Sequence, residues 1–142
     1  KTASGKQAAI SAGDLADTVD LGADYAGAVT TLVDMYLAKH DPETAGAILT
    51  RVEAHRPLEP TEEYRAALVA FATNQTDRAV SLLNSCIAMA PDYVAPRVEL
   101  IRYYASKGMT TKAMELQREA YGVAKNAKDK SEVAGAMVAR RR

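Results

Sequence analysis

Tryptophan is absent from the 142-residue sequence, and cysteine and phenylalanine occur once each, as Cys86 and Phe71. A single cysteine excludes an internal disulfide and an all-cysteine metal site. Glycine and proline number only 8 and 5, so few residues interrupt regular secondary structure. The chain must therefore be held by a packed apolar core, and its length suffices for one domain of ordinary size.

An excess of charge of either sign is also missing. Eighteen Lys and Arg residues balance eighteen Asp and Glu residues, so no net field draws the chain toward nucleic acid or anionic lipid. The sequence contains no apolar run of about 18 residues and no secretory leader pattern. We therefore expect no nucleic-acid partner and no membrane insertion, and the lone cysteine favours a cytoplasmic location.

A 34-residue repeat runs through most of the chain. Self-similarity at a fixed interval of about 20–50 residues is the signature of repeat architectures. Several positions keep this interval or twice this interval: Ala45, Ala79 and Ala113; Pro57 and Pro91; Tyr36 and Tyr104.

Each period contains two groups of apolar residues with helical spacing. In the first period one group runs from Val29 to Tyr36 and the other from Ala45 to Val52, on either side of Pro42. No segment shows the sustained alternation of a strand, and alanine is abundant, so an all-α fold is expected. The pattern predicts helices over residues 24–39, 42–55, 61–73, 76–89, 93–107, 110–126 and 130–139.

On this period, with the alanines, prolines and tyrosines that carry it, the chain resembles the tetratricopeptide repeat family. The resemblance implies a right-handed α-solenoid of antiparallel helix pairs. It covers residues 24–126 and implies three degenerate repeats, at about 26–59, 60–93 and 94–127.

The two ends of the chain lie outside these repeats. Residues 1–23 are expected to be a leader segment or the remnant of an earlier repeat, and self-association through this segment is one option. Residues 128–142 are expected to form a capping helix that ends in a basic tail, Arg140 to Arg142.

In such an array the first helix of each pair would line a concave face. Once the core positions are assigned, ten side chains remain to face this groove: Thr30, Asp34, Leu37, Tyr64, Arg65, Leu68, Phe71, Val98, Glu99 and Arg102. Tyr64, Leu68 and Phe71 recur at i, i+4 and i+7, so they form one apolar stripe. Either the N-terminal segment or a neighbouring repeat covers this stripe, or it holds an apolar anchor of a partner, with Asp34 and Glu99 facing basic residues beside it.

The family's known carboxylate clamp for chaperone tails can be tested on the same positions. The matching places hold Thr30, Asp34, Arg65, Ala95 and Glu99, which supply one cation and two anions. A clamp needs several cations and amides, so a chaperone tail is not the expected ligand.

Residues that could carry chemistry are few. His40 and His55 lie fifteen residues apart, without the spacing of a metal site, and Cys86 falls on a core position of a helix. There is no glycine-rich phosphate loop. We therefore expect no enzymatic activity, no metal and no cofactor.

The sequence thus favours a protein-interaction module, a scaffold or adaptor. Its expected partner is a protein or peptide with an apolar anchor and flanking basic residues. The alternative is a regulatory or sensor domain of a larger enzyme or transcription factor, in which the groove makes intramolecular contacts.

Overall fold

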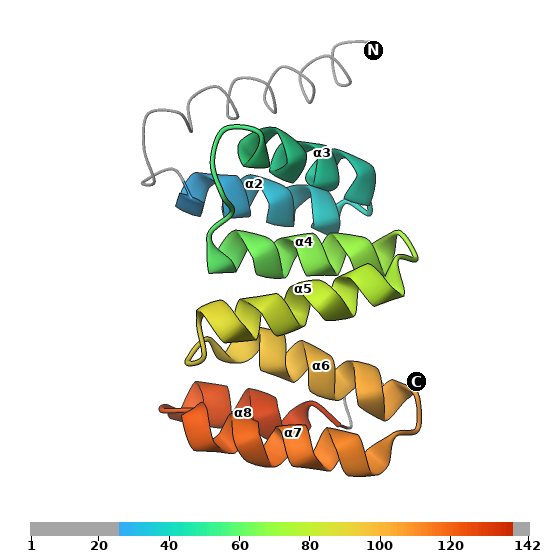
Figure 1. The fold of residues 1–142 in the computed structure, drawn as a ribbon, viewed down its shortest axis with the longest axis vertical. Helices are drawn as coiled ribbons and strands as arrows, with labels where there is room; N and C mark the ends of the chain where they lie inside the picture. The colour runs from blue at the N-terminus through green and yellow to red at the C-terminus, as the bar shows by residue number, and fades with distance from the viewer. Residues whose placement is uncertain (1–25, 138–142) are drawn as a thin grey trace. The chain divides into compact units, whose positions relative to one another are not determined.

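The computed structural model describes residues 26–137, which form seven α-helices and no strand (Figure 1). The all-α expectation is therefore confirmed for this part of the chain. The leader segment at 1–23 and the arginines at 140–142 lie outside the described residues. In chain order the helices are α2 (Ala26–Ala38), α3 (Pro42–Glu53), α4 (Pro60–Ala72), α5 (Thr76–Met89), α6 (Val94–Ser106), α7 (Thr110–Val123) and α8 (Ala127–Gly135).

The helix starts recur at the interval found in the sequence. The first helices α2, α4 and α6 begin at residues 26, 60 and 94, and each is 13 residues long. The second helices α3, α5 and α7 begin at residues 42, 76 and 110. All six starts lie within two residues of the predicted ones, so the 34-residue period is a period of secondary structure.

The final helix begins earlier than predicted, at Ala127 instead of residue 130. The reason is the side chain of Asn126, which accepts a hydrogen bond from the backbone amide of Asp129 at 2.8 Å. Asparagine is among the best N-cap residues, so this bond fixes the helix start. The first large apolar residue of this segment is Val133, so apolar spacing alone does not mark the helix start.

The turn between the helices of each pair has the same backbone geometry in all three periods. The second residue after each first helix adopts a left-handed conformation. The amide of the following residue donates a hydrogen bond to the carbonyl five residues earlier in the chain. This arrangement is a Schellman motif, which satisfies carbonyls at the helix end. The left-handed residues are His40 (φ 61°), Asn74 (φ 63°) and Gly108 (φ 77°), and the hydrogen bonds are Asp41 to Tyr36 (2.9 Å), Gln75 to Ala70 (2.8 Å) and Met109 to Tyr104 (2.9 Å).

The chain divides into two compact units, with the boundary between Ala79 and Val80 inside α5. In the first unit α2 packs against α3 and α4, and α3 also packs against α4. Its buried apolar residues on these helices are Val29, Val33, Tyr36, Ala45, Ile48, Leu49, Val52, Ala66, Ala67 and Ala70.

In the second unit α6 packs against both α7 and α8, and α7 also packs against α8. The core of this unit consists of Val94, Val98, Ile101, Ala113, Ala120, Ala124, Val133 and Ala136. The α8 helix covers apolar surface that α6 and α7 would otherwise expose, which is the role expected of a capping element.

The entrance to α4 is held by a buried ion pair. Glu62 is fully buried, and its carboxylate accepts two hydrogen bonds from Arg56, both at 2.8 Å, and one from the backbone amide of Glu59 at 2.7 Å. The hydrogen bond to Glu62 raises the pKa of Arg56 above its ordinary value, against the opposing effect of burial. The two side chains fix the connection from α3 to α4, because neither can be left alone at low cost.

Glu62→Ala is predicted to lower the free energy of unfolding by about 3 kcal/mol, since it leaves the mostly buried Arg56 without its counter-ion. Glu63→Ala, one residue further along and partly exposed, should change it by less than about 0.5 kcal/mol. Urea denaturation measures both values. Equal losses would contradict a specific role for the Glu62 carboxylate.

Two glycines, one in a turn and one in a helix, should respond oppositely to replacement by alanine. Gly108→Ala should destabilise the protein by about 1 kcal/mol, because φ is 77° there and an L residue is strained. Gly122→Ala, in helix α7, should instead stabilise it by up to about 1 kcal/mol, because an added Cβ meets nothing within 4 Å and alanine favours a helix. Thermal or chemical denaturation gives the two signs, and a shared sign would refute the argument.

Candidate functional site

The expected groove residues fall into two groups. Seven of them lie on the packed helices α2 and α4 of the first unit: Thr30, Asp34, Leu37, Tyr64, Arg65, Leu68 and Phe71. We call these seven the α2–α4 surface. The other three, Val98, Glu99 and Arg102, lie on α6 of the second unit and are described separately.

An ion pair between Asp34 and Arg65 joins α2 to α4. Nε of Arg65 donates to Oδ1 of Asp34 and Nη2 to Oδ2, each at 3.0 Å, which is the bidentate geometry that favours strong pairing. Nη1 donates to the backbone carbonyl of Thr61 at 3.2 Å, and the guanidinium also lies 5.5 Å from the ring centroid of Tyr64. Arg65 is thereby oriented by three neighbours.

This pair changes the role expected of Asp34. The sequence suggested that its carboxylate faces basic residues of a partner, whereas in the structure it is already bound by a cation of its own chain. The Asp34 side chain is nevertheless 50% exposed. A carboxylate has about four lone-pair sites, so two remain for another donor.

The apolar stripe of the α2–α4 surface is partly exposed. Tyr64, Leu68 and Phe71 each keep part of their surface accessible. The opposite side of α4 carries the alanines of the core, Ala66, Ala67 and Ala70, none more than 7% exposed. The helix therefore packs small residues into the core and leaves three large apolar side chains partly accessible.

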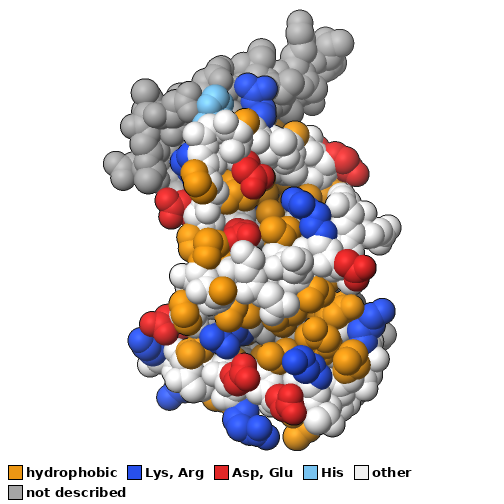
Figure 2. Space-filling view, viewed as in Figure 1, with side chains coloured by type: hydrophobic (Ala, Val, Ile, Leu, Met, Phe, Trp, Pro, Cys, Tyr) orange, Lys and Arg blue, Asp and Glu red, His pale blue; other side chains and the backbone are white. Residues whose placement is uncertain are grey.

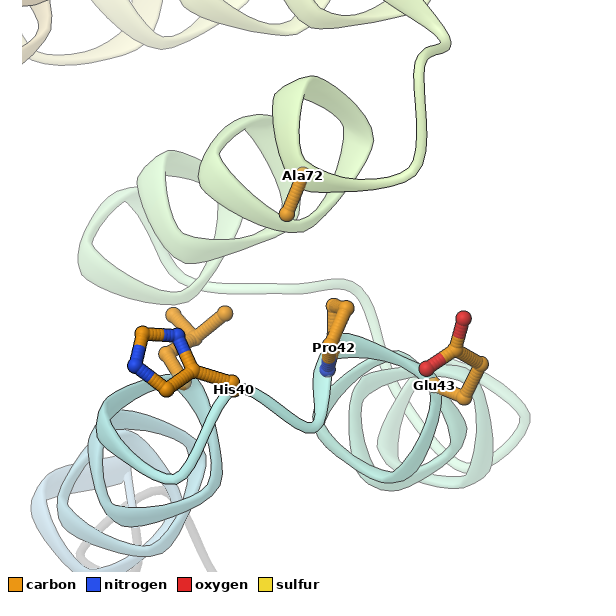
Figure 3. A pocket seen from close by; sticks show the side chains of 5 residues that line it. His40, Pro42, Glu43 and Ala72 are labelled. Carbon is orange, nitrogen blue, oxygen red and sulfur yellow. The ribbon is translucent and has the colours of Figure 1, made fainter.

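An open cavity of about 390 Å³, with a wide mouth to solvent, lies at one end of this surface, where the turn between α2 and α3 approaches the last residue of α4 (Figure 3). The side chains that line it are Leu37, His40, Pro42, Glu43 and Ala72. Figure 3 shows Ala72 pointing from α4 toward the turn, with His40 and Glu43 on either side of Pro42. Leu37 belongs both to the cavity and to the α2–α4 surface.

This cavity is not predicted by the sequence. The apolar pattern is interrupted at Pro42, and Asp41 caps the helix that follows by accepting a hydrogen bond from the amide of Thr44 at 3.1 Å. The local pattern contains no sign that the end of α4, some thirty residues later, comes to lie opposite this turn.

On α6, the structure corrects the placement of Val98. Its side chain is only 4% exposed and belongs to the core of the second unit, so it does not line an accessible groove. Val98 belongs to a buried cluster that also contains residues of α7 and α8, both of which pack against α6. Glu99 and Arg102 pair with each other at 3.2 Å.

Of the residues considered for chemistry, His40 lines the cavity. Cys86 is fully buried, as expected for a core position. Between residues 26 and 137 no cluster of three or more His, Cys, Asp or Glu side chains could hold a metal ion. Within the same range no helix has the length and apolarity needed to span a membrane.

Charges of both signs are mixed over the face of the molecule shown in Figure 2. Apolar side chains lie between them, and no large area of that face carries one sign alone. This distribution agrees with the balanced composition of the chain.

No family model, curated protein or solved structure matches this sequence. The resemblance to tetratricopeptide repeats therefore depends on the residues and on the period that they keep.

A double-mutant cycle can measure the ion pair of the site. With Asp34→Asn and Arg65→Gln, we expect a coupling of about 0.5–1 kcal/mol in the free energy of unfolding at low salt, because the geometry is bidentate but Asp34 is half exposed. The coupling should shrink in high salt. A coupling of zero at low salt would mean that the pair is not formed in solution.

Proposed function

We propose that this protein is an interaction module of the tetratricopeptide-like kind, which binds a peptide segment of a protein partner on its α2–α4 surface. The observation that carries the proposal is the common 34-residue interval of helix starts and left-handed turns. A helix pair of this kind cannot bury its apolar faces alone, so consecutive pairs stack and share a core.

The proposed architecture is a right-handed solenoid of three antiparallel helix pairs, with α8 as its cap. Equal lengths of the first helices support it, because stacked repeats need matching elements. Repeat arrays of this type offer an extended surface made by their first helices, and binding of peptides is the use to which such surfaces are best suited.

The anchor site of the proposed peptide is the stripe of Tyr64, Leu68 and Phe71. Aromatic residues are enriched among those that dominate binding energy, since they bury large areas at small entropic cost. Phe71 is the only phenylalanine in the chain and is not among its fully buried residues. A bound aliphatic or aromatic side chain would withdraw this apolar area from water.

The Asp34–Arg65 pair then sets the polar edge of the anchor site. Because Arg65 holds two of the carboxylate sites, a basic residue of the partner would add to an existing pair instead of neutralising a free acid. The attraction is therefore weaker than the sequence suggests, and the apolar contact supplies most of the affinity. The proposed partner keeps its apolar anchor, with the basic residue beside it as a secondary feature.

The test begins with panning a random peptide library against the full chain. Peptides that bind should lose affinity by roughly fivefold to 150-fold on Phe71→Ala, which corresponds to about 1–3 kcal/mol, mainly through faster dissociation. The control is Met114→Ala, which removes a half-exposed side chain from α7. Binding kinetics by surface plasmon resonance give both values.

Enriched peptides that bind equally well to wild type and to Phe71→Ala, and lose affinity only with the α7 variant, would place binding elsewhere. Failure to enrich any peptide would count against the proposed function as a whole.

A further inference from the structure

The cavity between the α2–α3 turn and the end of α4 combines an apolar lining with a polar rim. Leu37, Pro42 and Ala72 supply the apolar part, and the exposed side chains of His40 and Glu43 supply the polar part. At about 390 Å³ its volume lies near the lower end of the range of small-ligand sites, about 300–1,000 Å³. It therefore fits one long side chain better than a large cofactor.

The electrostatics of this cavity favour a cation. Glu43 contributes a carboxylate, and none of the ion pairs among residues 26–137 involves it. The helices α2 and α4 both end at the cavity, and a helix C-terminus carries roughly half a negative charge. The nearest cation along the chain, Lys39, has its ammonium 5.6 Å from the ring centroid of Tyr36, which serves as its local partner.

An anionic ligand is the competing possibility, because α3 begins at the same place and a helix N-terminus attracts anions. That end is already occupied by negative groups of the chain. Asp41 accepts from the amide of Thr44 at 3.1 Å, and Glu43 lies in the first turn. A carboxylate or phosphate would thus meet two acids before it reached the backbone amides.

We propose that this cavity receives a lysine or arginine side chain of the bound peptide. Its methylene stem would pack on Leu37, Pro42 and Ala72, and its charged end would pair with Glu43. The imidazole of His40 lies on the polar rim of the same cavity. This proposal rests on the proposed peptide-binding function and adds a position for the basic residue, at the end of the α2–α4 surface marked by Leu37.

A direct probe is N-acetyl-lysine methylamide, titrated into the isotope-labelled full chain and followed by nuclear magnetic resonance. We expect saturable shifts of residues 37–43 and 72, with a dissociation constant in the millimolar range. The uncharged analogue N-acetyl-norleucine methylamide should give no saturable shift there. This measurement does not depend on finding a peptide partner.

Two variants of Glu43 and one control sharpen the test. Glu43→Gln should weaken binding of the lysine probe about twofold to fivefold, because an exposed ion pair is of modest strength. Glu43→Lys should abolish binding, because it replaces the attraction with repulsion between like charges. Glu53→Gln removes another exposed carboxylate from α3, away from the cavity, and should leave binding unchanged. Shifts that are absent, equal for the norleucine probe, or insensitive to both Glu43 variants would overturn the proposal.

Peptides from the library separate this proposal from the function on which it rests. A required basic residue, when replaced by norleucine, should weaken binding to wild type but hardly change binding to Glu43→Gln. Peptides that need Phe71 but no basic residue would refute the cation site and leave peptide binding intact. Lysine-probe binding that depends on Glu43, without any peptide that needs Phe71, would support the cation site and refute peptide binding on the apolar stripe.

Discussion

The arrangement of this chain depends on one backbone position after each first helix, where φ must be positive. At that position the chain reverses, the last carbonyls of the helix find amide partners, and the second helix begins two residues later. Glycine fills it without strain in the third period, whereas His40 and Asn74 carry the cost that a side chain adds. In the first period the strained residue is His40, and its side chain also lines the cavity.

Much of the fold could be predicted from the sequence because its determinants are local or periodic. Apolar spacing and the 34-residue interval located six helices to within two residues of their starts. The start of the last helix needed one capping side chain, Asn126, which an apolar pattern does not register. Val98 was placed wrongly for a related reason, since it lies in a buried cluster that includes Val133 of α8, an element outside the repeat pattern.

The candidate site was predictable only in part. Helical spacing suffices to put Tyr64 and Phe71 on one stripe, because both lie on one helix. The Asp34–Arg65 pair joins residues 31 positions apart, and the cavity joins the ends of separate helices, so both depend on how helices are set against one another. In consequence the sequence overestimated the free negative charge along α2. Glu43, whose carboxylate forms no ion pair within residues 26–137, lies in the first turn of α3, where a negative charge also favours the helix start.

Because Cys86 is completely buried, its rate of reaction with a thiol reagent reports local opening of the structure around it. It is the sole thiol, and it lies on α5, the helix that contains the boundary between the two compact units. A thiol reagent can reach it only when that region opens, so its rate of modification in native conditions measures the free energy of that opening when closing is faster than reaction. Slower modification in the presence of a bound peptide would show that occupancy of the first unit tightens the helix shared with the second.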